Sequence, residues 1–159
     1  MNTNIRIGIG YDLHRLVEGR KLFLGGVKIP FSKGLMGHSD ADVLLHAVCD
    51  AIFGACGCAD IGVHFPDTDP RFKGISGSEF VKETRAIIEK DKEIKIINID
   101  TVIICDQPNI SGYRRAIVES IARLFDIGIE RVNIKAKTTE DTSADTISSY
   151  AVVLLEVIA

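Results

Sequence analysis

Residues 5–14 read IRIGIGYDLH, and apolar positions in this stretch alternate with small or polar ones. A period of two is typical of a β-strand, and it places the side chains of Asp12 and His14 on one face. Gly8 and Gly10 do not form a dinucleotide-binding fingerprint, because a third glycine is missing and no helix is expected to follow. The stretch therefore predicts a strand that carries a carboxylate and an imidazole side by side.

Further strand and helix signals follow along the chain. Their irregular alternation, together with one hairpin, favours a single α+β domain over residues 1–159. We expect a mixed four-stranded main sheet plus the hairpin, with helices on one face, and not a doubly wound fold. The expected elements are a hairpin over 21–31 with its turn at Gly25 and Gly26, a helix from Ser39 or Asp40 to about Cys56, a long lid or binding loop over 57–74, a helix from the capping box at 76–79 to about Lys90, a strand over 94–104, a helix over 111–126, and strands over 131–138 and 147–157.

The composition excludes several classes of protein. With 46% hydrophobic and 26% charged residues and a net charge of −3, the chain is globular and has no charge excess suited to general nucleic-acid binding. No apolar run reaches the roughly 18 residues of a membrane helix, and the N-terminal residues lack a signal-peptide pattern. The four cysteines show no paired C-x-x-C frame, so we expect them to be reduced and structural, in a cytoplasmic protein.

The expected helix around His46 carries an acidic stripe. At 100° per residue, Asp42, His46 and Asp50 fall one above another, without a lysine or arginine among them. A bound cation, or support for a metal ligand, explains such a stripe better than a solvated surface does. The opposite face, which should meet the core, consists of Leu44, Ala47, Val48, Ala51 and Ile52.

Asp12, His14 and His46 together make a candidate metal site. Two imidazoles and one carboxylate suit a catalytic zinc ion, because three protein ligands leave the fourth tetrahedral position open. The facial triad of non-haem Fe(II) enzymes uses the same side-chain types, so the spacing alone does not fix the metal.

Two segments offer groups that suit phosphate. Residues 37–40 precede the expected helix, whose free N–H groups attract anions, and His38 and Ser39 can add side-chain hydrogen bonds. Residues 135–140 leave a strand with two lysines and two threonines, and Glu140 could reach a Mg²⁺ ion shared with phosphate oxygens.

Six stretches carry a resemblance to a known family. They read IGIGYDLHR at 7–15, LGGVKIPF at 24–31, GHSDADVLLHAVCDAIFGA at 37–55, ADIGVHFPDTDPRFKGIS at 59–76, INIDTVII at 97–104 and VNIKAKTTE at 132–140. Together they resemble the 2-C-methyl-D-erythritol 2,4-cyclodiphosphate synthase family of the non-mevalonate isoprenoid pathway, nearly from end to end.

The resemblance implies a homotrimer whose sheets face the three-fold axis, with each active site between two subunits. One Zn²⁺ per subunit would be held by Asp12, His14 and His46, and Mg²⁺ or Mn²⁺ by Glu140. The substrate would be 4-diphosphocytidyl-2-C-methyl-D-erythritol 2-phosphate, whose 2-phosphate attacks the β-phosphorus and releases CMP. No nucleic acid or membrane is implied as a partner.

The resemblance also implies roles for individual residues. His38 and Thr138 match positions that stabilise the transition state. Residues matching the walls around the erythritol phosphate are Ser39, Asp60, Ile61, Gly62, Phe65, Pro66, Asp67, Thr68 and Asp69. Residues that would frame the cytidine and its phosphates are Cys105, Asn109, Ala136, Lys137 and Thr139.

Two places depart from the family pattern. Asn109 stands where most relatives carry a lysine, so one phosphate or nucleotide contact would be neutral. Residues 141–146 are shorter than the usual glycine-bearing loop and have no counterpart of its arginine.

Two alternatives to the synthase are consistent with the same residues. A zinc hydrolase of phosphate esters or anhydrides could use the three ligands, with Asp42 or Asp50 as general base. A non-catalytic trimer that binds a nucleotide or an isoprenoid could have lost activity through the changes at Asn109 and 141–146.

Overall fold

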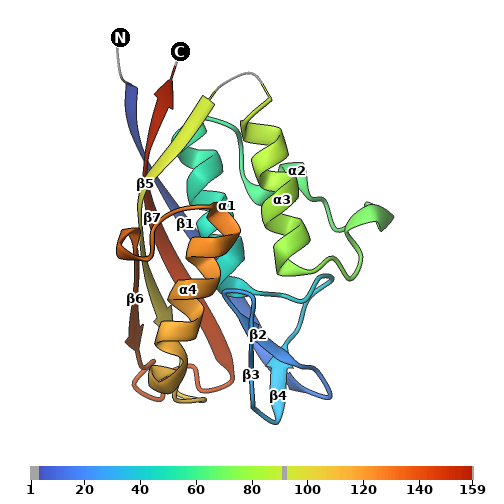
Figure 1. The fold of residues 1–159 in the computed structure, drawn as a ribbon. Coiled ribbons are helices and arrows are strands. Elements are labelled where there is room, and N and C mark those ends of the chain that lie inside the picture. Colours follow the sequence, from blue (N-terminus) through green and yellow to red (C-terminus); the bar gives the residue numbers. More distant parts are fainter. Residues whose placement is uncertain (1–3, 91–92, 159) are drawn as a thin grey trace.

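The computed structural model describes residues 4–90 and 93–158, which form one α+β domain with helices on one face of a mixed sheet (Figure 1). The main sheet has the order β4-β1-β7-β5-β6, in which only β5 and β6 are parallel, and β2 and β3 form a separate hairpin. The strands are β1 (Asn4–Glu18), β2 (Leu22–Leu24), β3 (Val27–Ile29), β4 (Lys33–Leu35), β5 (Glu93–Ile104), β6 (Val132–Lys137) and β7 (Thr146–Ile158). The helices are α1 (Val43–Cys56), α2 (Ile61–His64), α3 (Gly77–Ile88) and α4 (Arg114–Phe125), with 3₁₀ turns η1 (Pro70–Phe72), η2 (Ser111–Tyr113) and η3 (Ile129–Arg131).

The backbone of α1 packs directly on β1 because two glycines of that strand carry no side chain. A Cβ on Gly8 would lie 1.9 Å from the carbonyl oxygen of Ala51, and one on Gly10 would lie 2.0 Å from that of Ala47. Glycine is the residue that permits such a close backbone approach. The two glycines therefore set the distance between α1 and the sheet.

The other side of α1 is covered as well, by α3 and the hairpin. Leu45, Cys49 and Phe53, which lie off the predicted core face, are fully buried. The prediction of a single buried face was therefore too narrow, because a helix enclosed between a sheet and further elements is apolar almost all round.

Asp42 connects this helix to the hairpin. Its carboxylate accepts hydrogen bonds from the backbone N–H groups of Gly25 (2.9 Å) and Gly26 (2.6 Å), and from that of Leu45 (3.1 Å) in the first turn of α1. The turn at Gly25 and Gly26 is confirmed, and both residues have the positive φ that glycine adopts readily. Burial raises the pKa of Asp42, while these N–H donors favour its charged form.

The structure corrects three expectations. Helix α1 begins at Val43 rather than Ser39 or Asp40, because Asp42 is its N-cap. Strand β4 adds a fifth strand to the main sheet, pairing with the end of β1; three residues are too few to show an alternating pattern. The segment 57–74 contains α2 and η1, whose first turns are capped by Asp60 and Asp69.

The sheet face away from the helices is apolar and exposed along β1 and β7. Ile7 and Ile9 are 70% and 68% exposed, and the Tyr11 and Tyr150 rings lie 4.6 Å apart on the neighbouring strands. Contiguous apolar surface of this kind marks an interaction site. Further exposed members of this face are Ile5, Leu13 and Val152.

The four cysteines form no disulfide in the described part of the chain, as expected. Burial raises the pKa of Cys49 to about 12 and that of Cys105 to about 11, so both thiols stay protonated and act as small apolar groups. None of the helices within 4–90 and 93–158 has the length and apolar character needed to span a membrane.

Gly10→Ala should destabilise the protein by about 1–3 kcal/mol or more, because the new methyl group meets backbone atoms of α1 that have no room to move. Urea-induced unfolding would measure the loss. Gly112→Ala is the matched control: a Cβ there has no neighbour within 4 Å, and the change should stay within about 0.5 kcal/mol. Equal stability of the two variants would contradict the packing argument.

Candidate active site

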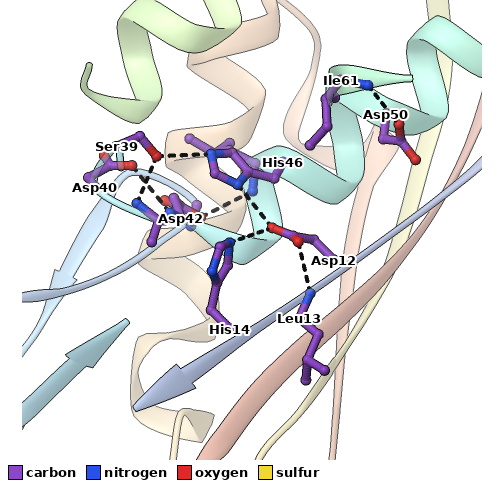
Figure 2. Close-up of polar contacts among 12 residues, drawn as sticks. Asp12, Leu13, His14, Ser39, Asp40, Asp42, His46, Asp50 and Ile61 are labelled. Atoms are coloured by element: carbon purple, nitrogen blue, oxygen red, sulfur yellow. Dashed lines mark hydrogen bonds and ion pairs between the residues drawn. The ribbon is translucent and has the colours of Figure 1, made fainter. Parts of the chain in front are cut away.

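Asp12, His14 and His46 converge at the point where β1 passes the first turns of α1 (Figure 2). Asp12 Oδ2 lies 2.9 Å from His14 Nε2 and 2.9 Å from His46 Nδ1. One ligand atom from each residue can be chosen so that all three lie within 4.8 Å of one another. The close packing of α1 on β1 brings His46 from the helix over the two strand residues.

One buried nitrogen of this cluster, on His14, has no satisfied hydrogen bond. His14 Nε2 is buried and makes no well-angled hydrogen bond to the described residues, although Asp12 is close. Burial alone would raise the pKa of Asp12, but the two neighbouring imidazoles outweigh it and lower the pKa. For His14, burial would lower the pKa, but Asp12 outweighs it and raises the pKa.

The outer nitrogens of both imidazoles have partners of their own. Ser39 Oγ lies 3.4 Å from His46 Nε2, and the backbone of Met36 hydrogen-bonds His14. The ring of Phe80 packs on His46 with centroids 4.6 Å apart. Such contacts fix ring orientation and tautomer, as they do around metal-binding histidines.

This donor set fits a metal ion. Ligand atoms around tetrahedral Zn²⁺ are about 3.4 Å apart for metal–ligand distances of about 2.1 Å, within the range that the cluster spans. The buried, unsatisfied nitrogen of His14 and a carboxylate shared by two imidazoles also suit a cation. Three ligands on one side leave the cavity side open.

The cluster lies in a cavity of about 730 Å³. Seven of the predicted site residues line it, His38 as a catalytic residue and six as substrate contacts, which brings the 38–39 segment and the 61–69 segment together. They are His38, Ser39, Ile61, Gly62, Phe65, Asp67 and Asp69. Asp60, Pro66 and Thr68 belong to the same segment but do not line the cavity; Asp60 instead accepts the Val63 N–H at the start of α2.

The anion site at the N-terminus of α1 remains a prediction, and the geometry there differs from that expected. The Asp42 side chain already occupies the Leu45 N–H, and His38 and Ser39 lie in the loop before the helix. Asp50 accepts the Ile61 N–H at 3.2 Å and so holds α2. The acidic stripe on α1 therefore anchors neighbouring segments by hydrogen bonds to their backbones.

The remaining predicted residues lie away from this cavity. Leu13 of β1, Ser148 of β7, Ile104 of β5 and Lys137 of β6 are in register across the sheet. Three strand spacings of about 4.8 Å put the end of β6 about 14 Å from that point of β1. Ala136 and Lys137 line a second cavity of about 470 Å³.

The loop after β6 is held by hydrogen bonds close to this second cavity. Asp106 accepts the N–H of Thr139 at 2.7 Å and also its hydroxyl, and the Thr138 hydroxyl donates to Glu140. Cys105 N–H donates to the Lys137 carbonyl at 3.0 Å. The roles expected of Thr138, Glu140, Cys105, Asn109 and Thr139 remain predictions.

The cavity of about 730 Å³ around the cluster, from here on the metal-side cavity, is also lined by three basic residues that were not predicted from the sequence. They are Arg15, Arg20 and Lys73. Arginine and lysine are common in turns and at strand ends, so their positions gave no signal. Sequence reasoning also missed Asp106, whose contact with Thr139 joins residues 33 positions apart. Pairing of this kind depends on the parallel alignment of β5 and β6.

The fold is a mixed sheet with helices on one face, and it carries an aspartate–histidine cluster that is open to a cavity. These features define a class of α+β proteins that can bind a metal ion beside a ligand. The chain belongs to the YgbB family, whose sequence profile matches residues 5–156. It is similar to the 2-C-methyl-D-erythritol 2,4-cyclodiphosphate synthases of Clostridium acetobutylicum (52% identity over 155 residues, covering 95% of this chain and 99% of the relative) and Fusobacterium nucleatum (50% over 156 residues, covering 96% and 97%).

A solved structure of a 2C-methyl-D-erythritol-2,4-cyclodiphosphate synthase with CDP bound superimposes with a TM-score of 0.88 at 40% identity, covering 94% of this chain and 99% of that one. The resemblance stated from the sequence motifs is thus confirmed.

The Asp12–His14 pair predicts how the stability of the metal-free protein depends on pH. Because the pKa of His14 is raised in the folded state, the His14 imidazolium stabilises the fold. This contribution to the free energy of unfolding is fully present below about pH 6.5 and is lost as the pH rises through the folded-state pKa. Because the pKa of Asp12 is lowered in the folded state, its carboxylate also stabilises the fold. That contribution to the free energy of unfolding is present above pH 3.8 and is lost as the pH falls through the folded-state pKa.

Asp12→Asn should therefore cost more unfolding free energy at about pH 5.5 than at about pH 8.5, measured by urea titration of chelator-treated protein. The exposed Asp141→Asn is the control. A loss of unfolding free energy in Asp12→Asn that does not change with pH would contradict the pairing of Asp12 with a protonated His14.

Proposed function

We propose that this protein is a 2-C-methyl-D-erythritol 2,4-cyclodiphosphate synthase, acting in non-mevalonate isoprenoid biosynthesis in the cytoplasm. The observation that carries the proposal is the open Asp12–His14–His46 cluster in a cavity lined by residues of the family motifs. Its substrate is 4-diphosphocytidyl-2-C-methyl-D-erythritol 2-phosphate, and the products are the cyclic diphosphate and CMP. Curated relatives at about 50% identity carry this name.

We assign one Zn²⁺ per subunit to Asp12, His14 and His46, and Mg²⁺, or Mn²⁺ in its place, to Glu140. When bound, these ions withdraw electron density from the phosphates and neutralise their charge. The ligand set supports zinc because two imidazoles and one carboxylate with an open position are typical of catalytic zinc.

The protein's own residues position the substrate. Nucleophile and leaving group belong to one molecule, so holding the 2-phosphate against the β-phosphorus can contribute about 7–11 kcal/mol to lowering the barrier. We assign transition-state stabilisation to His38 and Thr138, and binding of the erythritol phosphate to Ser39 and the 60–69 segment. No protein nucleophile is required, in agreement with the protonated Cys49 and Cys105 thiols.

The second cavity, beside Ala136 and Lys137, is the proposed binding place of the cytidine and its phosphates, framed also by Cys105, Asn109 and Thr139. Lys137, which lines this cavity, lies about 14 Å across the sheet from Leu13 of β1, the strand that carries Asp12 and His14. A homotrimer in which one subunit supplies the metal side and its neighbour the cytidine side accounts for this separation. The exposed apolar face of β1 and β7 supports a trimer with the sheets facing the three-fold axis.

A zinc hydrolase is the weaker alternative. It needs a general base beside the metal-bound water, and both candidates are engaged: Asp42 is fully buried among the N–H groups of the hairpin turn, and Asp50 holds Ile61. A non-catalytic trimer would require that the neutral Asn109 abolish turnover.

The activity is tested by phosphorus NMR of purified protein incubated with the substrate and Mg²⁺. Formation of the cyclic diphosphate and CMP is expected; orthophosphate would indicate hydrolysis, and CDP binding without turnover a non-catalytic protein. His46→Ala should lose zinc and at least the roughly 10–100-fold in activity that follows loss of residues supporting a metal ligand, while staying folded. His64→Ala, which alters a histidine outside the cluster, should keep its zinc, and full zinc in His46→Ala would refute the ligand assignment.

The trimer is tested at Ile7. Ile7→Asp places a carboxylate on the exposed apolar face of β1, and its desolvation in an interface should shift the protein to monomers in sedimentation velocity experiments. Ile129→Asp is the control, because Ile129 is 59% exposed but lies in η3, outside the strands. A trimeric Ile7→Asp variant would contradict the proposed arrangement.

A further inference from the structure

Arg20 reaches from the turn after β1 into the metal-side cavity. One of its terminal nitrogens, Nη2, donates a 2.7 Å hydrogen bond to the carbonyl oxygen of Ser39, and its side chain lines the cavity beside the cluster. Its charge is close enough to His14 to oppose protonation of that imidazole. None of the residue roles considered above involves this arginine.

The segment that Arg20 contacts has no regular secondary structure and is held at points on either side of Ser39. Gly74 N–H donates to the His38 carbonyl at 2.8 Å, and Asp40 N–H donates to the Ile75 carbonyl at 3.2 Å. The Ser39 carbonyl belongs to the same peptide group as the Asp40 N–H. Arg20 at the carbonyl and Ile75 at the N–H therefore hold this peptide group from both ends.

Ser39 in turn contacts the cluster. Its hydroxyl oxygen accepts the Ala41 N–H at 3.0 Å and lies 3.4 Å from His46 Nε2. The other nitrogen of the same ring, Nδ1, lies 2.9 Å from Asp12 Oδ2. A continuous path thus runs from the guanidinium through Ser39 to the His46 imidazole of the cluster.

We propose that Arg20 is a positioning residue of the metal site, which holds Ser39 so that its hydroxyl keeps the His46 ring oriented toward the metal. The proposal rests on the proposed function, because it takes Asp12, His14 and His46 as metal ligands. An arginine suits this task because its planar, permanently charged fork makes a strong hydrogen bond in a fixed direction.

Positioning and plain electrostatics predict opposite results for Arg20→Gln. A positive charge beside a Zn²⁺ site repels the ion, so loss of the charge alone would tighten zinc binding. Loss of a contact that orients a ligand weakens metal binding by about 10–100-fold. The sign of the change in zinc affinity therefore separates the two roles without any measurement of turnover.

The test is a zinc titration of chelator-stripped full-length protein against a competing chelator at one fixed pH. We expect Arg20→Gln to weaken zinc binding by about 10-fold or more. An unchanged or tighter zinc affinity would overturn the proposal. If the wild-type protein itself binds no zinc, the proposed function fails instead, so the two failures are distinguishable.

A double-mutant cycle shows whether the effect passes through Ser39. Ser39→Ala should weaken zinc binding by itself, and Arg20→Gln should then add less than about twofold, because the path is already broken. Arg15→Gln is the matched control: it removes another arginine of the same cavity that has no hydrogen bond to Ser39, and its effect should be the same with and without Ser39→Ala. Full additivity of Arg20→Gln and Ser39→Ala would contradict the path.

Discussion

The close approach of α1 to β1 at Gly8 and Gly10 is the contact on which the site depends. A helix normally packs on a sheet through side chains. Here the carbonyl groups of Ala47 and Ala51 occupy the space that glycine leaves free. His46 adjoins this contact, so the same closeness that builds the core also determines the spacing of the three candidate ligands.

Carboxylates on or beside α1 hold the loops that surround the cavity. Asp42 binds two N–H groups of the hairpin turn, Asp40 binds the first N–H of α3 at Gly77, and Asp50 binds the first N–H of α2 at Ile61. Hydrogen bonds from backbone N–H groups to a carboxylate are stronger than those between neutral groups. The loops that wall the cavity are thus tied by hydrogen bonds to the most buried helix of the domain, which also carries His46.

The elements with strong periodicity could be predicted from the sequence. The two long strands β1 and β7, the hairpin turn at Gly25 and Gly26, and the capping box at Ser76 follow from local patterns and are present in the structure. The cluster could be anticipated because Asp12 and His14 share a strand face by simple alternation. Adding His46 to the cluster required the assumption that its helix lies against that strand face.

What the sequence did not disclose depends on contacts between distant residues. Strand β4 exists only through its pairing with the end of β1. The start of α1 at Val43 follows from Asp42 turning inward to bind the hairpin, which no local rule anticipates. Arg20 gave no signal, since its partner is a backbone carbonyl and its effect depends on the path of residues 36–41 in space.

The two faces of β1 are separated by a single position along the chain. Asp12 and His14 point toward α1, while Tyr11 and Leu13 alternate with them on the exposed apolar face. A slip of one residue in the pairing of β1 with β7 would exchange the two sets, burying the apolar residues and presenting the ligands to the surface. The register of β1 therefore determines both where the candidate metal ligands lie and which residues form the exposed apolar face. An insertion or deletion within β1 would disrupt the two together.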